Sequence, residues 1–339
     1  MGQQGPEWKG NMGLKILGTG KYLPSTVVTN EDFTRIVDTS DEWIVKRTGM
    51  KERRIASEPT HVMAERAARA AIEDAGLSPL DIDLILCTTV TSDYITPALA
   101  CIVQGAIGAK NAAAFDINAA CAAFVYALDM ANMYLQHGYH HILIVSAEGL
   151  SKITDYTDRS TCVLFGDAAG ACVVGKGDGD FQSVLGTDGT GAHTLFARRP
   201  LNDIPFVTQD DPQSIDHFPD VGRPGVLYMD GREVYKFAVG AMNHALRAAC
   251  DKFGITPADL DLIIPHQANL RIIQSAAREL GLPLERFYVN IDRYGNTSSA
   301  CIPVALAELA EKGELLPGRK VGMVGFGAGL VYGGCVFTL

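Results

Sequence analysis

The sequence lacks the features that mark several classes of protein. Its 29 Lys and Arg are outnumbered by 39 Asp and Glu, so the formal net charge is −10, and this acidic excess argues against binding to nucleic acid. The eight Cys include no Cys-x-x-Cys pair, so neither a zinc ribbon nor a thioredoxin-like motif is present. For a chain of 339 residues without a secretory leader, we expect reduced thiols, a cytoplasmic location and no metal site.

Neither end of the chain predicts a membrane segment. Residues 1–11 are polar and have no apolar stretch of the kind found in a signal peptide, so we expect a tail, with Met12 as an alternative start. Residues 321–339 carry no charge, and their length would suffice for a membrane helix. They include six Gly, however, which favours a strand, a loop and a second strand.

The sequence contains an internal repeat. Residues 75–85 read AGLSPLDIDLI and residues 253–263 read FGITPADLDLI, so the second segment echoes the first at a fixed offset. The same offset aligns AACAAFVYAL at 119–128 with TSSACIPVAL at 297–306. Such a repeat predicts two similar halves, which we place at 12–182 and 183–339. Strands alternate with helices in each half, so we expect an α/β fold of layered sheets and helices, with a site where the halves meet.

Cys121 is the first candidate for a catalytic residue. It follows a short apolar run, and Phe124, Leu128 and Ala131 then recur at helical spacing. The sequence thus predicts a strand that turns at Cys121 into the first turn of a buried helix. Because a helix N-terminus favours negative charge and lowers the pKa of a thiol, we expect a reactive thiolate. An inert, buried cysteine is the alternative interpretation.

Two polar residues of the second half are its candidate partners. Residues 261–274 read DLIIPHQANLRIIQ, which predicts a strand that ends at Pro265 and a helix that begins at His266. Asn296 lies in a turn ahead of another helix. Each residue taken alone is more typical of a structural role. The pseudo-symmetry brings the strand ends together, so we expect both side chains to share one site with Cys121.

A tryptophan and an arginine share one face of an early helix. Residues 39–42, TSDE, form a capping box that predicts a helix start at Thr39, and Trp43 and Arg47 are four residues apart. This pair suits a nucleotide base and its phosphates, although a packed Trp beside a surface Arg explains the spacing equally well. Residues 190–225 are rich in Pro, Asp and Gly and predict a long surface excursion.

Six segments carry a family resemblance when taken together. They are TSDEWIVKRTG (39–49), FDINAACAAF (115–124), TDRSTCVLFGD (157–167), IPHQANLRII (264–273), YGNTSSA (294–300) and GFGAG (325–329). The chain resembles, over nearly its whole length, the β-ketoacyl-acyl carrier protein synthase III family of the thiolase-like superfamily. The resemblance implies a five-layered α-β-α-β-α fold of two pseudo-symmetric halves, a homodimer, and a triad of Cys121, His266 and Asn296.

The implied reaction is a decarboxylating condensation. Cys121 would take the acyl group from an acyl-CoA, after which malonyl-acyl carrier protein would bind and lose carbon dioxide. His266 and Asn296 would donate hydrogen bonds to the malonyl thioester carbonyl as enolate charge develops. The carbanion would attack the acyl group, whose oxyanion the backbone N–H groups of Cys121 and Ala328 would hold. The product is a 3-oxoacyl carrier protein that initiates fatty acid synthesis. No cofactor is expected, because acyl-CoA is a substrate.

The resemblance also implies binding residues. Those that match CoA-binding positions are Thr39, Trp43, Arg47, Arg159, Gly231, Tyr235 and Asn269. The first four would surround the adenine and the phosphates, and the last three would line the pantetheine channel. Those that match a basic patch for the acidic carrier protein are Lys236, Arg271 and Arg278. Such a patch can steer an acidic partner to an acidic protein.

Three positions depart from the family pattern. Ala328 and Ala123 replace glycines that are common in the family. Thr96, before Pro97, replaces a Phe that acetyl-selective members often carry. We therefore expect an acyl pocket at Thr96 that accepts primers longer than acetyl.

Other functions compete with this interpretation. A condensing enzyme of secondary metabolism or signal synthesis, with a different primer or acceptor, would use the same triad. The order Cys, His, Asn also occurs in papain-like proteases, but their flanking sequences are missing here. A degradative thiolase needs a second Cys just before the glycine loop, where this chain reads VGMVG at 321–325. A non-catalytic acyl-binding protein would not need Cys121.

Overall fold

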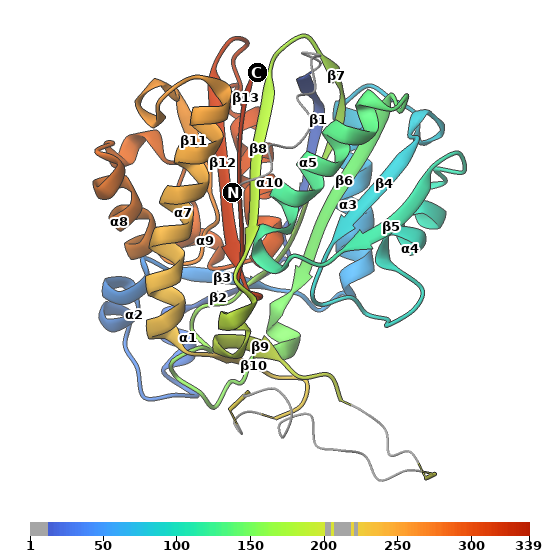
Figure 1. The fold of residues 1–339 in the computed structure, drawn as a ribbon. Helices are drawn as coiled ribbons and strands as arrows, with labels where there is room; N and C mark the ends of the chain where they lie inside the picture. Colours follow the sequence, from blue (N-terminus) through green and yellow to red (C-terminus); the bar gives the residue numbers. More distant parts are fainter. Residues whose placement is uncertain (1–12, 201–204, 207–217, 220–222) are drawn as a thin grey trace.

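Two β-sheets form the framework of the molecule (Figure 1). The computed structural model describes residues 13–200, 205–206, 218–219 and 223–339, so the predicted tail at 1–11 and Met12 lie outside the described residues. The first sheet has the order β1-β7-β6-β4-β5 and the second has the order β11-β12-β13-β8. The strands of the first sheet are β1 (Gly13–Tyr22), β4 (Leu84–Thr88), β5 (Ala113–Ile117), β6 (His141–Gly149) and β7 (Asp167–Gly177). Those of the second are β8 (Phe181–Thr187), β11 (Leu262–Pro265), β12 (Lys320–Gly327) and β13 (Val331–Thr338).

Helices complete five layers with the two sheets. The helices of these layers are α3 (Thr60–Asp74), α4 (Leu99–Ile107), α5 (Ala123–Gln136), α7 (Gly231–Phe253), α8 (Leu270–Leu280) and α10 (Cys301–Glu311). Helices α5 and α10 lie between the sheets and share one buried apolar cluster with both of them (Figure 1). A second cluster joins α3 and α4 to the outer face of the first sheet. A third joins α7 and α8 to the outer face of the second. The implied α-β-α-β-α fold is confirmed.

The internal repeat extends to the backbone conformation. The 3₁₀ turns η1 (Pro79–Asp81) and η5 (Pro257–Asp259) occupy equivalent positions of the repeat, and so do η2 (Ala120–Ala122) and η7 (Ser298–Ala300). The equivalent residues Ala120 and Ser298 have φ angles of 44° and 51°, in the left-handed region that residues other than glycine seldom adopt. One sheet ends with β7 and the other begins with β8 at Phe181, so the predicted boundary at 182 and 183 falls inside β8.

Smaller elements cover the lower end of the molecule in Figure 1. They are β2 (Thr26–Thr29), α1 (Asn30–Phe33), α2 (Asp41–Thr48), β3 (Glu52–Ile55), β9 (Leu195–Ala197) and β10 (Leu227–Met229). The remaining short elements are η3 (Leu150–Ile153), η4 (Gly189–Thr194), η6 (Leu284–Arg286) and α9 (Ile291–Tyr294). Strand β9, which lies in the predicted excursion at 190–225, pairs antiparallel with β10, which lies just beyond it. Its residues 201–204, 207–217 and 220–222 lie outside the described residues.

The structure corrects two predicted helix starts. Ser40 rather than Thr39 is the N-cap of α2, because its hydroxyl accepts the Trp43 N–H. His266 does not begin a helix, since α8 starts at Leu270. Gln267 holds the intervening loop, because its side chain donates to the carbonyl groups of Pro265 and Tyr288 at 2.9 and 3.0 Å.

The uncharged C-terminal segment forms two antiparallel strands, as predicted. Strand β12 pairs with β13 along its whole length, so the uncharged residues are accounted for by a buried sheet. In the part of the chain that the structure describes, no helix combines the length and apolar character needed to cross a membrane.

Candidate active site

A cavity of about 720 Å³ lies between the two halves of the molecule. Its walls include residues at or just after the carboxyl ends of strands from both sheets, namely Val90, Asn118, Leu150, His266 and Phe326. In sheets built with parallel strands, this edge is where ligands usually bind. Cys121, His266 and Asn296 all line this cavity. The structure therefore brings together the three residues that the sequence nominates.

Cys121 lies in the turn η2, between the end of β5 and the start of α5. This is the strand-to-helix position that the sequence predicts. Burial raises the pKa of the Cys121 thiol to about 12, while a hydrogen bond with Ser298 lowers it and the Glu148 carboxyl raises it. The expectation of a lowered pKa is therefore wrong, because removal of the sulfur from water outweighs the dipole at the helix N-terminus.

His266 is a neutral residue at the end of β11. Its side chain is buried, with 1% of the residue exposed. Its backbone N–H donates to the carbonyl of Val324 at 2.8 Å, and its ring meets Phe326 edge-on at a centroid distance of 5.1 Å. Burial lowers the pKa of the imidazole to about 3. At pH 7 the ring is uncharged, so one ring nitrogen donates a hydrogen bond and the other accepts one.

Asn296 is fixed by the first half of the chain. Its backbone N–H donates to the Leu164 carbonyl at 2.9 Å, and its carbonyl accepts the Gly166 N–H at 3.0 Å. Its side-chain Oδ1 accepts the Ser298 N–H at 2.9 Å. Because the oxygen of the carboxamide is engaged in this way, its amide nitrogen is the group that can donate into the cavity.

The end of β12 packs directly against the turn that carries Cys121. A Cβ atom added to Gly327 would lie 2.6 Å from the Cys121 backbone nitrogen, so no side chain fits there. Gly327 and Ala328 both line the cavity. The φ angle of Ala328 is not positive, so alanine adopts this backbone without strain. The two N–H groups predicted to hold an oxyanion thus come from segments in close contact.

Sequence reasoning missed a buried carboxyl group behind the site. Glu148, in β6, accepts hydrogen bonds from the hydroxyls of Thr91, Ser299 and Ser298 at 2.7, 2.8 and 3.0 Å. It also accepts the Val90 N–H at 3.1 Å. Burial raises the pKa of Glu148, and these hydrogen bonds oppose the rise. The sequence signal that could have revealed this buried carboxyl group is a single acidic residue inside the apolar run ILIVSAEG.

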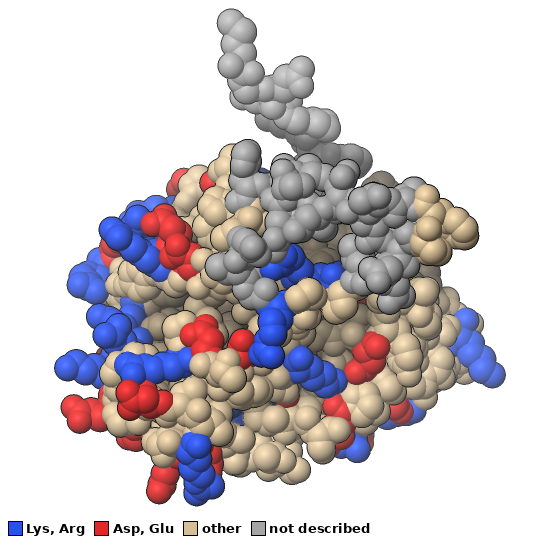
Figure 2. All heavy atoms as spheres, turned by 90° about the horizontal axis from the view of Figure 1, so that it is seen from below, with Lys and Arg blue, Asp and Glu red and all other residues tan. Residues whose placement is uncertain are grey.

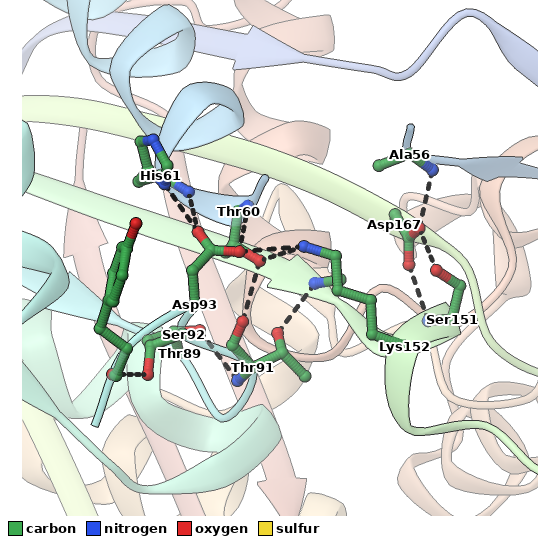
Figure 3. Close-up of polar contacts among 12 residues, drawn as sticks. Ala56, Thr60, His61, Thr89, Thr91, Ser92, Asp93, Ser151, Lys152 and Asp167 are labelled. Carbon is green, nitrogen blue, oxygen red and sulfur yellow. Dashed lines mark hydrogen bonds and ion pairs between the residues drawn. The ribbon is translucent and has the colours of Figure 1, made fainter. Parts of the chain in front are cut away.

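A second carboxyl group, that of Asp93, holds the loop that contributes Val90 and residues 92–95 to the cavity wall (Figure 3). Asp93 accepts the backbone N–H groups of Thr60 and His61 at 3.0 and 2.8 Å. It also contacts His61 Nδ1 at 2.9 Å and Lys152 Nζ at 3.2 Å. Burial raises the pKa of Asp93, but the hydrogen bonds from His61 and Thr60 lower it by more. The net result is a pKa of about 2, below the ordinary value of 3.8. The loop is thus tied to the start of α3.

Trp43 contacts two guanidinium groups. The ζ carbon of Arg159 lies 4.7 Å from the indole centroid, and that of Arg47 lies 5.2 Å from it. Arg159 also donates to the Asp38 carbonyl at 2.7 Å. A guanidinium at 4.7 Å is in direct contact with the ring, so Arg159 must move before adenine can lie between them. Thr39 precedes α2, and among the described residues its buried hydroxyl has no hydrogen-bond partner.

The three residues predicted for the pantetheine channel all line the cavity. They are Gly231, Tyr235 and Asn269. Asn269 caps α8 by accepting the Arg271 N–H at 2.9 Å. The Tyr235 hydroxyl lies 2.9 Å from Ser275 Oγ, which joins α7 to α8 at this end of the cavity.

The predicted basic residues lie on the same two helices. Lys236, Arg271 and Arg278 are exposed on α7 and α8. Lys236 pairs with Glu233 at 2.7 Å, an exposed ion pair of little energetic value. Figure 2 shows Lys and Arg side chains, mixed with acidic ones, around a hollow in the lower face. Sequence reasoning did not identify Arg198 and Arg199, which line the cavity.

Thr96 is not among the residues that line this cavity. It is exposed, and its loop reaches the cavity through Val90 and residues 92–95. The acyl-pocket role of Thr96 therefore stays a prediction.

Known proteins resemble this chain over nearly its whole length. Two family models match it, 3-oxoacyl-[acyl-carrier-protein (ACP)] synthase III over residues 115–189 and its C-terminal counterpart over residues 250–339. The β-ketoacyl-[acyl-carrier-protein] synthase III of Clostridium acetobutylicum is 47% identical over 329 residues, which are 95% of this chain and 98% of that protein. A solved structure of 3-oxoacyl-[acyl-carrier-protein] synthase III from Aquifex aeolicus matches with a TM-score of 0.87 and 42% identity, over 96% of this chain and 100% of the other. The priming β-ketosynthase of a polyketide biosynthetic pathway matches with a TM-score of 0.87 and 38% identity, over 98% and 99% of the two chains. The chain belongs to the β-ketoacyl-[acyl-carrier-protein] synthase III family.

Proposed function

We propose that this protein condenses an acyl-CoA primer with malonyl-acyl carrier protein, with loss of carbon dioxide, and so initiates fatty acid synthesis as an acyltransferase. The observation that carries the proposal is that Cys121, His266 and Asn296 line one cavity beside the backbone at 327–328, in a member of this family. A thiol, a neutral imidazole and a carboxamide supply a nucleophile and two hydrogen-bond donors.

The first half-reaction transfers the acyl group to the enzyme. The Cys121 sulfur attacks the thioester carbonyl of acyl-CoA, the C–S bond to CoA breaks, and the thiol proton passes to the departing CoA thiolate. The backbone N–H groups of Cys121 and Ala328 hold the oxyanion of the tetrahedral intermediate. The Ser298 side chain also hydrogen-bonds the Cys121 thiol and lowers its pKa.

The second half-reaction forms the carbon–carbon bond. The malonyl group of the carrier protein loses carbon dioxide, and the electron pair left behind forms an enolate. His266 and Asn296 donate hydrogen bonds to its oxygen, which stabilises that charge without a change in their own protonation. The enolate carbon attacks the acyl carbonyl and expels the Cys121 thiolate, which takes up a proton. The products are 3-oxoacyl carrier protein, carbon dioxide and free enzyme.

The substrates are held by the remaining predicted residues. CoA adenine lies between Trp43 and Arg159, with Arg47 and Thr39 near the phosphates. The pantetheine arm follows Gly231, Tyr235 and Asn269 into the cavity, as their place on its wall supports. The acidic carrier protein docks at Lys236, Arg271 and Arg278, where exposed positive charge favours it.

The assembly is a cytoplasmic homodimer that needs no cofactor, since acyl-CoA is consumed as a substrate. Tyr94 and Ile95 support a protein partner beside the cavity, because these neighbouring apolar side chains on its wall are 53% and 75% exposed. A sedimentation experiment that finds only monomer at micromolar concentration contradicts the dimer.

A primer panel tests the proposed reaction. The enzyme is incubated with malonyl-acyl carrier protein and acyl-CoA primers from acetyl to octanoyl, straight and branched, and the carrier protein is weighed by mass spectrometry. We expect the carrier protein to gain a 3-oxoacyl group that is two carbons longer than the acyl group of the primer. We also expect primers longer than acetyl to be accepted. Release of free acid without condensation contradicts the proposal. An acetyl preference of several orders of magnitude in kcat/KM contradicts only the longer-primer prediction.

A condensing role in secondary metabolism is the second candidate. It is favoured by the match to the priming β-ketosynthase of a polyketide pathway at 38% identity. The same panel, run with carrier proteins from both kinds of pathway, separates the two roles by their kcat/KM values.

A further inference from the structure

A second cysteine lies directly behind the proposed catalytic histidine. Cys301 is the first residue of α10, and 2% of it is exposed. Its Sγ lies 3.0 Å from His266 Nδ1. Cys301 is not among the residues that line the cavity, whereas His266 is. The imidazole therefore has one nitrogen bound to the protein interior and leaves its other nitrogen, Nε2, for the cavity.

The surroundings of Cys301 favour its thiol as the donor of this hydrogen bond. The backbone N–H of Gln267 donates to the same sulfur at 3.4 Å, so the sulfur already accepts one hydrogen bond. Burial raises the pKa of the Cys301 thiol and lowers that of the imidazole to about 3, so both groups are uncharged at pH 7. A neutral thiol carries one proton to donate, and His266 Nδ1 is the acceptor in contact with it.

We infer that Cys301 is a positioning residue, which donates its S–H to Nδ1 of His266 and thereby keeps the imidazole proton on Nε2. The inference rests on the proposed function, in which Nε2–H donates to the oxygen of the malonyl-derived enolate. The opposite tautomer would point a lone pair at that oxygen and would lose the hydrogen bond when the charge develops. The contact with Val324 holds the His266 backbone, and the contact with Phe326 orients the imidazole ring. The hydrogen bond from Cys301 determines which ring nitrogen carries the proton.

The wild-type enzyme provides the first test. Protein grown with ¹⁵N-labelled histidine is examined by two-bond proton–nitrogen correlation, and the His266 signals are identified by their loss in His266→Asn. We expect the pattern of an Nε2–H tautomer at pH 7. A pattern of the Nδ1–H tautomer overturns the inference, and this result does not depend on the folding of any Cys301 variant.

Two substitutions provide the second test. Cys301→Ser keeps a donor at this position, and Cys301→Ala removes it while leaving a small apolar side chain. We expect Cys301→Ala to slow malonyl-carrier protein decarboxylation by about 10-fold or more, as when an orienting partner of a functional histidine is lost. Acylation of Cys121 by acyl-CoA is expected to stay within about twofold, and Cys301→Ser to recover decarboxylation to within about threefold of wild type.

The outcomes separate this inference from the proposed function. If wild-type enzyme decarboxylates malonyl-carrier protein and Cys301→Ala does so equally well, the inference is wrong and the proposed function stands. Equal slowing of both half-reactions in Cys301→Ala, with a matching fall in Tm, also overturns it, because that is the signature of a purely structural residue. If wild-type enzyme shows no decarboxylation at all, the proposed function itself fails.

Discussion

The Asp93 contact predicts a measurable link between stability and the shape of the cavity. Helix α3 begins at Thr60, and its N-cap residue, Pro59, supplies no side-chain hydrogen bond. The Asp93 carboxylate, in the loop that lines the cavity, caps the helix instead. It accepts hydrogen bonds from the N–H groups of Thr60 and His61. The variant Asp93→Asn keeps the shape of this side chain but loses its charge and turns one acceptor into a donor.

The size of the effect follows from the pKa. A fall from 3.8 to about 2 corresponds to at most about 2.4 kcal/mol of free energy of unfolding, and solvent screening at this partly exposed site reduces it to about 1 kcal/mol. Because the pKa is lower in the folded protein, the contribution is complete above pH 4 and is lost as the pH falls through 2. We expect Asp93→Asn to be less stable by about 1–2 kcal/mol at pH 7, since one hydrogen bond is also lost.

Urea unfolding between pH 7 and pH 3 measures this difference. The control is Asp178→Asn, an exposed residue between β7 and β8, which we expect to change stability by less than about 0.5 kcal/mol. The KM for acyl-CoA should rise in Asp93→Asn, because the loop at 90–95 loses its anchor. A loss of stability at pH 7 no larger than that of the control, or one that is as large at pH 3 as at pH 7, would refute the reasoning.

Three further predictions concern the groups around the cavity. Glu148→Ala leaves several buried donors without an acceptor and should lower the free energy of unfolding by about 3 kcal/mol or more. Glu148→Gln should lower it clearly less. Equal losses for the two variants in urea titrations would contradict this prediction. Arg159→Ala should raise the KM for acyl-CoA about five- to tenfold and leave the KM for malonyl-carrier protein unchanged; an unchanged acyl-CoA KM removes Arg159 from the adenine site. The pKa of about 3 for His266 is below its ordinary value of about 6.5, so the unfolded chain takes up a proton first. Stability should fall by about 2 kcal/mol between pH 7 and pH 5 from this group alone, and His266→Asn should lack that part of the pH dependence.

Regular features of the fold were predictable from the sequence because they are local or repeated. The fixed offset between the halves places η2 opposite η7 and α5 opposite α10. Apolar spacing around Cys121 correctly predicts a strand that turns into a helix. The strand that ends at Pro265 and the turn at Asn296 likewise follow from short sequence patterns. Together with the repeat, these three local patterns were sufficient to predict that the proposed catalytic residues share one site.

The features that the sequence did not reveal depend on contacts between distant segments. The N-terminus of α3 is capped by Asp93, 33 positions beyond Thr60, so no local capping pattern exists. The start of α8 was placed too early, because the loop before it is held by Gln267 across to Tyr288. The pKa of Cys121 was predicted in the wrong direction, since its burial is produced by β12 and η7, which are remote in the chain.

The most direct test of the central claim is to measure both half-reactions in Cys121→Ala and Asn296→Ala. Acyl-enzyme formation is read by intact-mass spectrometry after incubation with acyl-CoA, and decarboxylation is read as carbon dioxide released from malonyl-carrier protein. We predict that Cys121→Ala gains no acyl mass, whereas Asn296→Ala is acylated at close to the wild-type rate and decarboxylates much more slowly. An acyl group retained in Cys121→Ala, or equal loss of both half-reactions in Asn296→Ala, would contradict the account.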